Sequence, residues 1–149
     1  MNQSPDRTML RKTLFITAIC LLVLGAACKS APPPPSATFK TYFEAQKKKD
    51  IAGMKQTLSK TSLLMMEASA KQQQLTIDKM IQSQLENPAS KIDKMPESRN
   101  EKITGDSATL ELHNEEANRW DTMYFIKEDG AWKIALDRTI EEMFRRNGA

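Results

Sequence analysis

The spacing of apolar residues changes from a helical to a strand period at Asn87-Pro88, and this change constrains the fold more than any other feature. Residues 55–87 contain no glycine or proline, and four apolar residues near their end recur on one helical face: Ile77, Met80, Ile81 and Leu85. Beyond Pro88, apolar and polar residues alternate, as they do in half-buried strands. Helices that precede strands in this way are typical of an α+β fold with an antiparallel sheet.

Two shorter helices are expected before this region. A hydroxyl of Ser36 or Thr38 would cap the first, and Asp50 would cap the second. The polar segment Lys71–Gln74 predicts a break in the long helical region. Methionines on these helices could line an adaptable binding surface, although core packing is the simpler interpretation: Met54, Met65, Met66 and Met80.

The second half of the chain predicts two hairpins and a terminal helical turn. Residues 103–113 are predicted to form a strand, a Gly-Asp turn and a second strand, and residues 119–127 are predicted to form the next strand. A turn at Asp129-Gly130 leads into a last arm that buries Trp132, Ile134 and Leu136, and residues 140–146 predict the helical turn. The strand 119–127 is apolar on both faces, and the helices can cover only one. We therefore expect the other face to meet a second subunit, an envelope protein or a membrane.

The first 27 residues have the layout of a secretory signal peptide. A basic segment, Met1–Lys12, precedes the uncharged and mostly apolar residues 13–27, which are too short for the ~20 apolar residues of a membrane-spanning helix. Ala26-Ala27-Cys28 resembles the bacterial lipobox, in which the chain is cut before an acylated cysteine. Cys28 is therefore predicted to be the lipid-bearing mature N-terminus; an ordinary signal peptide that leaves a free thiol is the alternative.

Residues 28–37 are predicted to be a lipidated tether. Pro32–Pro35 favour a polyproline II rod that rises ~3.1 Å per residue. Cys20 would leave with the signal peptide, so Cys28 could form no internal disulfide. These features predict a protein of the cell envelope, anchored to a membrane by its lipid. Lys29 stands where the inner-membrane lipoproteins of two-membrane bacteria carry a retention aspartate, so this resemblance implies the periplasmic side of the outer membrane if the source has two membranes.

Three phrases and the order of elements resemble the NTF2-like superfamily. The phrases are residues 39–45 (FKTYFEA), 105–109 (GDSAT) and 128–134 (EDGAWKI). Within that superfamily, the sequence is most similar to small bacterial lipoproteins of the DUF4878 group, once labelled lumazine-binding-like. The resemblance implies an NTF2-like domain at 38–149, a cone in which N-terminal helices pack on a curved antiparallel sheet around an apolar pocket. This fold hosts enzymes and non-enzymes alike.

Little in the sequence predicts catalysis. His113 is the single histidine, and no metal-spaced cysteine pair, nucleophile elbow or phosphate-binding glycine loop is present. We therefore expect no metal, no cofactor and no catalytic set. Tyr42 and Asp121 could imitate the tyrosine and acid of isomerases of this superfamily, so an enzyme remains the alternative. With 22 Lys and Arg against 19 Asp and Glu, the chain has no basic surface suited to nucleic acid.

The expected function is therefore binding. The interior positions are almost all apolar, and an apolar pocket with one phenol suits a ligand better than it suits acid–base catalysis. A small apolar ligand or an envelope protein is the expected partner, and a purely structural envelope role is a further alternative. The residues expected to line the pocket are Phe39, Tyr42, Phe43, Met54, Trp132 and Ile134.

Overall fold

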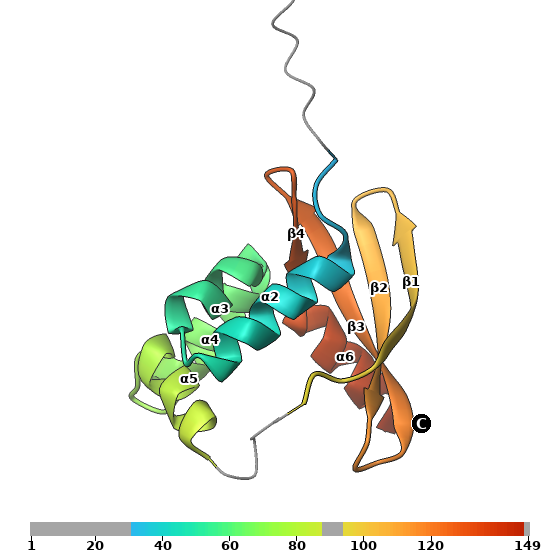
Figure 1. Ribbon diagram of the computed structural model, residues 1–149. Helices are drawn as coiled ribbons and strands as arrows, with labels where there is room; N and C mark the ends of the chain where they lie inside the picture. The colour runs from blue at the N-terminus through green and yellow to red at the C-terminus, as the bar shows by residue number, and fades with distance from the viewer. Residues whose placement is uncertain (1–30, 88–93, 148–149) are drawn as a thin grey trace, which may run out of the picture. The chain divides into compact units, whose positions relative to one another are not determined.

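The computed structural model describes residues 31–87 and 94–147, and the described residues from Pro32 onward belong to one compact unit (Figure 1). Helices come first and the sheet last, which confirms the predicted α+β order. The elements are α2 (Pro35–Lys47), α3 (Ile51–Thr57), α4 (Lys60–Gln72), α5 (Ile77–Glu86), β1 (Ser98–Thr104), β2 (Ser107–Asn114), β3 (Arg119–Glu128), β4 (Ala131–Ile134) and α6 (Leu136–Asn147).

Helix α2 begins at Pro35, without the hydroxyl cap that the sequence predicted at Ser36 or Thr38. Proline suits this first position because its φ is preset and its missing N–H would have no partner there. The two residues predicted as caps instead form hydrogen bonds with the sheet, Ser36 through its backbone and Thr38 through its side chain. The Ser36 N–H donates to Glu101 Oε2 at 2.8 Å, and Thr38 Oγ1 donates to the Trp132 carbonyl at 3.2 Å.

The next three helices are capped by side chains. Asp50, Ser59 and Thr76 each accept a hydrogen bond from the backbone N–H three residues further on. The cap at Asp50 and the helix break at Lys71–Gln74 were both predicted from the sequence, and both are confirmed, since α4 ends at Gln72 and α5 begins at Ile77.

The strands form one antiparallel sheet in the order β1-β2-β3-β4. The predicted turns are present, with positive φ at Gly105 and Gly130. Strand β1 is exposed along its whole length and its register shifts between Arg99 and Lys102, where Asn100 has a φ of 53°. This irregularity is a bulge at the outer edge of the sheet.

The chain leaves the sheet earlier than the sequence predicted. Strand β4 ends at Ile134, and Leu136 is the first residue of α6 rather than the end of a strand. The helix can begin there because the Leu136 N–H donates to Ser62 Oγ at 2.8 Å, which satisfies an N-terminal amide. From there α6 runs along the part of β3 that β4 does not pair, and Tyr124 N–H donates to Thr139 Oγ1 at 3.1 Å.

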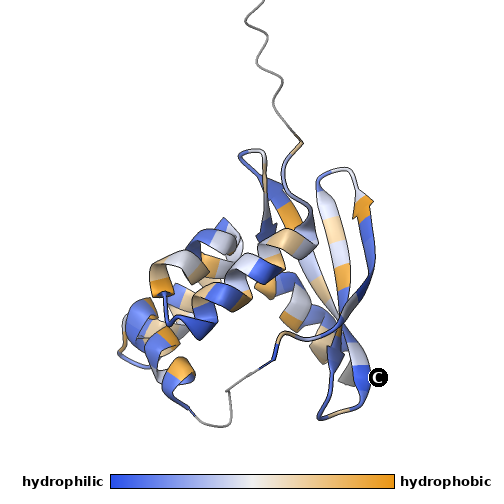
Figure 2. Cartoon of the chain, in the orientation of Figure 1, coloured by the Kyte–Doolittle hydropathy of each residue, from blue (hydrophilic) through white to orange (hydrophobic). Residues whose placement is uncertain are grey.

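Helices α2–α5 lie on one face of the sheet, as Figure 1 shows. Hydrophobic and hydrophilic residues alternate along these elements (Figure 2), and the buried ones form two apolar clusters. The helix–sheet cluster contains Phe39, Leu58, Ala108, Leu110, Phe125, Trp132 and Ile134. The helix–helix cluster contains Ala45, Met54 and Ile81. Burying a large apolar side chain contributes about 1.5–3 kcal/mol, so these clusters dominate the stability of the fold.

Candidate binding site

The side chains on the helix-facing side of β3 are buried at one end of the strand and accessible to solvent at the other. Phe125 is 0% exposed, and Met123, the next residue on that face, is only partly buried. Beyond it, the side chains of Asp121 and Arg119 are 29% and 50% exposed. The helical layer therefore covers one end of this face and leaves the other end accessible to solvent.

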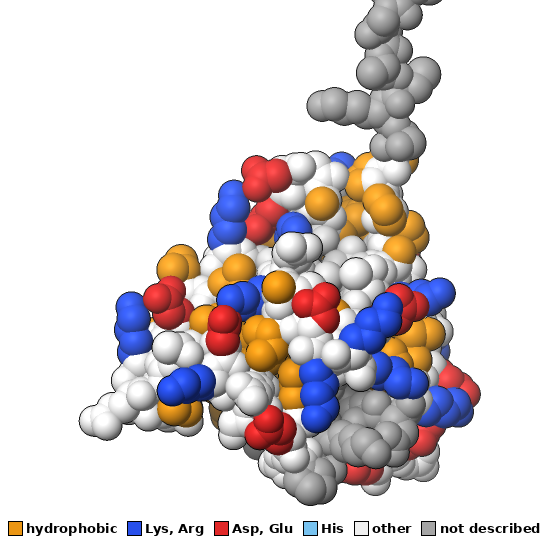
Figure 3. All heavy atoms as spheres, turned by 60° about the vertical axis from the view of Figure 1, so that its left-hand side comes forward, with side chains coloured by type: hydrophobic (Ala, Val, Ile, Leu, Met, Phe, Trp, Pro, Cys, Tyr) orange, Lys and Arg blue, Asp and Glu red, His pale blue; other side chains and the backbone are white. Residues whose placement is uncertain are grey.

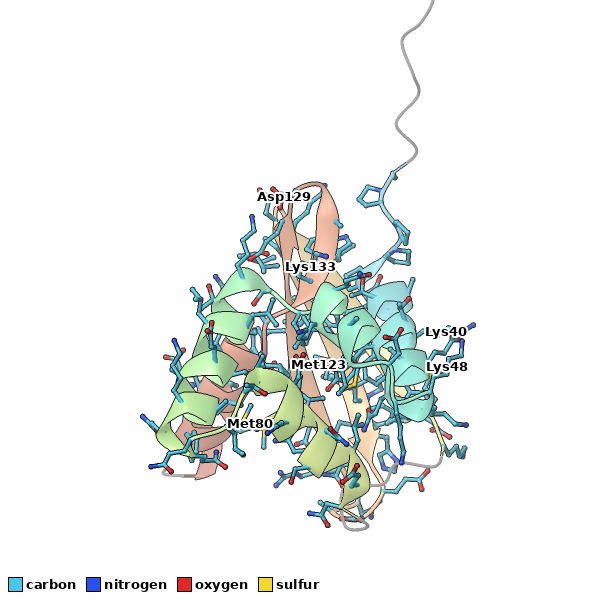
Figure 4. All side chains as sticks on the ribbon, turned by 90° about the vertical axis from the view of Figure 1, so that its left-hand side faces the viewer. Lys40, Lys48, Met80, Met123, Asp129 and Lys133 are labelled. Carbon is cyan, nitrogen blue, oxygen red and sulfur yellow. The ribbon has the colours of Figure 1, made fainter. Side chains whose placement is uncertain are left out.

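Four partly buried side chains that pack against the apolar clusters come from both the helical layer and the sheet. Tyr42 of α2 and Met66 of α4 pack against both apolar clusters, whereas Leu112 of β2 and Met123 of β3 pack against the helix–sheet cluster. Figure 4, which looks at the helical side, labels Met123 over the strands, where it is seen between the ribbons of the helices. We call these four residues the seam. They give the helix-facing side an apolar surface that solvent can reach.

The surface on the helical side of the molecule is mixed. Figure 3 shows hydrophobic side chains exposed there between Lys, Arg, Asp and Glu side chains.

The phenol oxygen of Tyr42 is the only side-chain oxygen or nitrogen among the four seam residues. Burial raises the pKa of its phenol above the ordinary value of 10.0, so the hydroxyl stays neutral at physiological pH. Among the described residues, none forms a hydrogen bond with this hydroxyl, and no side-chain polar atom is both buried and without a partner. The Tyr42 hydroxyl is therefore in contact with solvent and free to bond a ligand.

A polar group of three residues borders the seam on the open side. Asp121 lies directly opposite Leu112 across the β2–β3 pair. Arg119 Nε lies 2.9 Å from Asp121 Oδ1, and Asn114 Nδ2 donates to Asp121 Oδ2 at 3.2 Å. Asp121 is therefore neutralised and held by its own neighbours.

The residues predicted to line a pocket are mostly core residues. Phe39, Phe43, Met54, Trp132 and Ile134 are at most 6% exposed. Among the six, Tyr42 alone is partly accessible. Whether the buried five contact a ligand stays a prediction.

The structure places His113 and Asp121 on opposite faces of the sheet. His113 lies on the face of the sheet that α2–α5 leave uncovered, opposite the face of Asp121. There its ring stacks on that of Trp120, with centroids 4.9 Å apart. Proton transfer requires approach to about 3 Å, directly or through one water, and residues on opposite faces of a sheet do not meet this condition.

We call the face of the sheet opposite α2–α5 the outer face. Arg99 stacks on Trp120 at 3.8 Å from the ring centroid, and its Nε bonds Glu111 Oε2 at 2.8 Å. The hydrogen bond from Arg99, followed by that from Asn100, lowers the pKa of Glu111 below 4.5. This cluster joins the edge strand β1 to β3 across β2.

The part of the chain that the structure describes carries neither a metal-binding cluster nor a membrane-spanning helix. No group of three or more His, Cys, Asp or Glu side chains there could hold a metal ion. No helix of that part is long and apolar enough to span a membrane. Cys28 and the segment predicted to be a signal peptide lie outside the described residues.

Three of the four seam residues were absent from the predicted lining. Alternation along the strands places Leu112 and Met123 on a face, and helical spacing does the same for Met66. The sequence does not say where the helical layer ends over the sheet, and that boundary decides which apolar residues remain accessible.

Comparison with known families gives one match. The model of the family described as “Putative lumazine-binding” matches residues 36–137, the greater part of the chain. The α+β fold agrees with an NTF2-like domain, and the family description indicates a ligand-binding module. Neither the curated proteins nor the solved structures gave a match.

Proposed function

Because the chain belongs to the “Putative lumazine-binding” family, we propose that it is a non-catalytic module that binds a small apolar ligand at the seam. The seam itself carries this proposal. Its residues are largely apolar and partly accessible, all four pack against the helix–sheet cluster, and Tyr42 and Met66 also pack against the helix–helix cluster. Methionine suits such a site because its unbranched, polarisable side chain adapts to the shape of a ligand.

The proposed ligand contact is tested by paired substitutions on one strand. We expect Met123→Gln to weaken binding, because it places an amide where the ligand's apolar body would pack. The measurement is mass spectrometry of small molecules that copurify with the protein from its native membranes. The matched control is Ile126→Gln, on the outer face of the same strand. Equal ligand content in both variants and the wild type would contradict binding at the seam.

We further propose that Cys28 anchors the module to a membrane of the cell envelope, on the periplasmic side of an outer membrane where the source has two. The sequence pattern at Ala26-Ala27-Cys28 supports this. One acyl chain binds only marginally, so several chains would be needed for stable anchoring. Cys28→Ser should release the protein from membranes or leave it uncleaved. A variant that fractionates and migrates like the wild type would contradict the anchor.

A second proposed contact is a homodimer, or an envelope protein bound in the same place, on the outer face. Trp120, Tyr124 and Ile126 lie there partly exposed, on the side that α2–α5 do not cover. Aromatic residues of this kind are enriched where proteins meet.

A further inference from the structure

At the described positions that neighbour the seam along α2 and α4 and across the β2–β3 pair, the charges balance. The residues one helical turn before and after Tyr42 and Met66 are all uncharged: Thr38, Phe39, Ala45, Gln46, Ser62, Leu63, Ser69 and Ala70. Across the strands, Met123 lies opposite Leu110 and Leu112 lies opposite Asp121. Among these positions Asp121 alone is charged, and Arg119 pairs with it at 2.9 Å. An ionised ligand would therefore meet no uncompensated opposite charge.

The seam nevertheless offers one hydrogen bond. The ring of Tyr42 packs against both apolar clusters, which fixes its position. Its hydroxyl has no hydrogen-bond partner among the described residues and touches solvent. A neutral phenol can both donate and accept, so it can bond a carbonyl or a hydroxyl of a ligand.

We propose that the seam selects a neutral ligand, an apolar body with a hydrogen-bonding oxygen that the Tyr42 hydroxyl recognises, over a fatty-acid-like anion or a cation of the same size. This inference rests on the proposed binding function and names the ligand class. Tyr42 is the residue that determines specificity, and the apolar side chains of the seam supply the contact area.

The physical reason is the cost of desolvation. Moving an ionised carboxylate or ammonium into apolar surroundings costs far more than moving a neutral carbonyl, unless an opposite charge and hydrogen bonds compensate. Arg119 could compensate a carboxylate, but it already pairs with Asp121, which would repel the incoming anion. Because burial raises the pKa of Tyr42, the affinity for a neutral ligand should also be constant across the neutral pH range.

The test uses four probes with one hydrocarbon body: naphthalene, 2-acetylnaphthalene, 2-naphthoate and 2-naphthylmethylammonium. Their dissociation constants for the full-length chain are measured by equilibrium dialysis. We expect the ketone to bind about two- to tenfold more tightly than naphthalene, the range of one net hydrogen bond, and both ions to bind more weakly than the ketone. Tyr42→Phe should remove the advantage of the ketone and leave the naphthalene affinity unchanged.

Thr41→Val is the control, because Thr41 is exposed on α2 beside Tyr42 and outside the seam, so the loss of its hydroxyl should change no affinity. Tightest binding of the naphthoate or of the ammonium, or a ketone advantage that survives Tyr42→Phe, would overturn the inference while binding itself stands. Loss of naphthalene binding in Met123→Gln, with ketone selectivity in the wild type, would support both proposals. Absence of saturable binding by every probe would overturn both this inference and the proposed binding of small apolar molecules.

Discussion

At the scale of the residue, Gly53 shows how closely helices α2 and α3 approach each other. A Cβ at this position would lie 2.4 Å from Asp50 Oδ2 and 3.2 Å from the Cβ of Ala45. Replacing glycine by alanine inside a helix usually stabilises it by up to about 1 kcal/mol. Here we expect Gly53→Ala to lower the free energy of unfolding by about 1 kcal/mol, because it displaces the Asp50 cap. Urea denaturation measures the change.

The sign of this effect depends on the cap. In an Asp50→Ala background the carboxylate is gone, so adding the methyl group at Gly53 should be neutral or stabilising. Stabilisation by Gly53→Ala in the wild-type background would show that the cap can move aside without cost.

Glu111 predicts an acid dependence of stability. Arg99 and Asn100 lower its pKa in the folded chain below 4.5, so its stabilising effect is present above that pH and is lost as the pH falls through the folded-state pKa. We expect the wild type to be more stable than Glu111→Gln at pH 7, and this difference to shrink below pH 4.5. Denaturation at a series of pH values tests this. A difference that does not change with pH would contradict it.

At the scale of the element, Ser62 joins α4, β4 and α6. Its side chain is 0% exposed, and its Oγ accepts from the Leu136 N–H and donates to Asp137 Oδ1, both at 2.8 Å. Ser62→Ala leaves these buried groups without a partner, so we expect the free energy of unfolding to fall by about 1–3 kcal/mol. The exposed neighbour Thr61→Ala should change it by less than about 0.5 kcal/mol. Equal effects in urea denaturation would contradict this role.

The same contact explains where sequence reasoning failed. The cap at Asp50, the break after α4 and both hairpin turns follow from local chemistry, namely polar side chains beside amides and glycine at positive φ. The start of α6 depends on Ser62, which lies 74 residues before Leu136 in the chain. The accessible seam residues likewise depend on packing between distant elements. Contacts of this kind cannot be found from periodicity.

At the scale of the whole molecule, the proposed homodimer can be tested by sedimentation. A chain that begins at residue 28 with Cys28→Ser should sediment as a dimer at high concentration, because pairing would bury the aromatic side chains of the outer face. Tyr124→Glu should make it monomeric. Leu64→Glu, at a 67% exposed position on α4, is the control that should not. A monomer at every concentration would contradict the dimer and leave a different protein as the partner.

The bulge in β1 has a consequence for how many copies can join. A sheet can grow when a neighbour's strand aligns with its free edge. At this edge the register shift between Arg99 and Lys102 puts successive N–H and C=O groups out of step, and charged side chains flank the irregularity. A neighbouring strand could form backbone hydrogen bonds in register with β1 on one side of the bulge and not on the other. The irregular edge therefore disfavours strand-by-strand growth of the four-stranded sheet where many copies are crowded together.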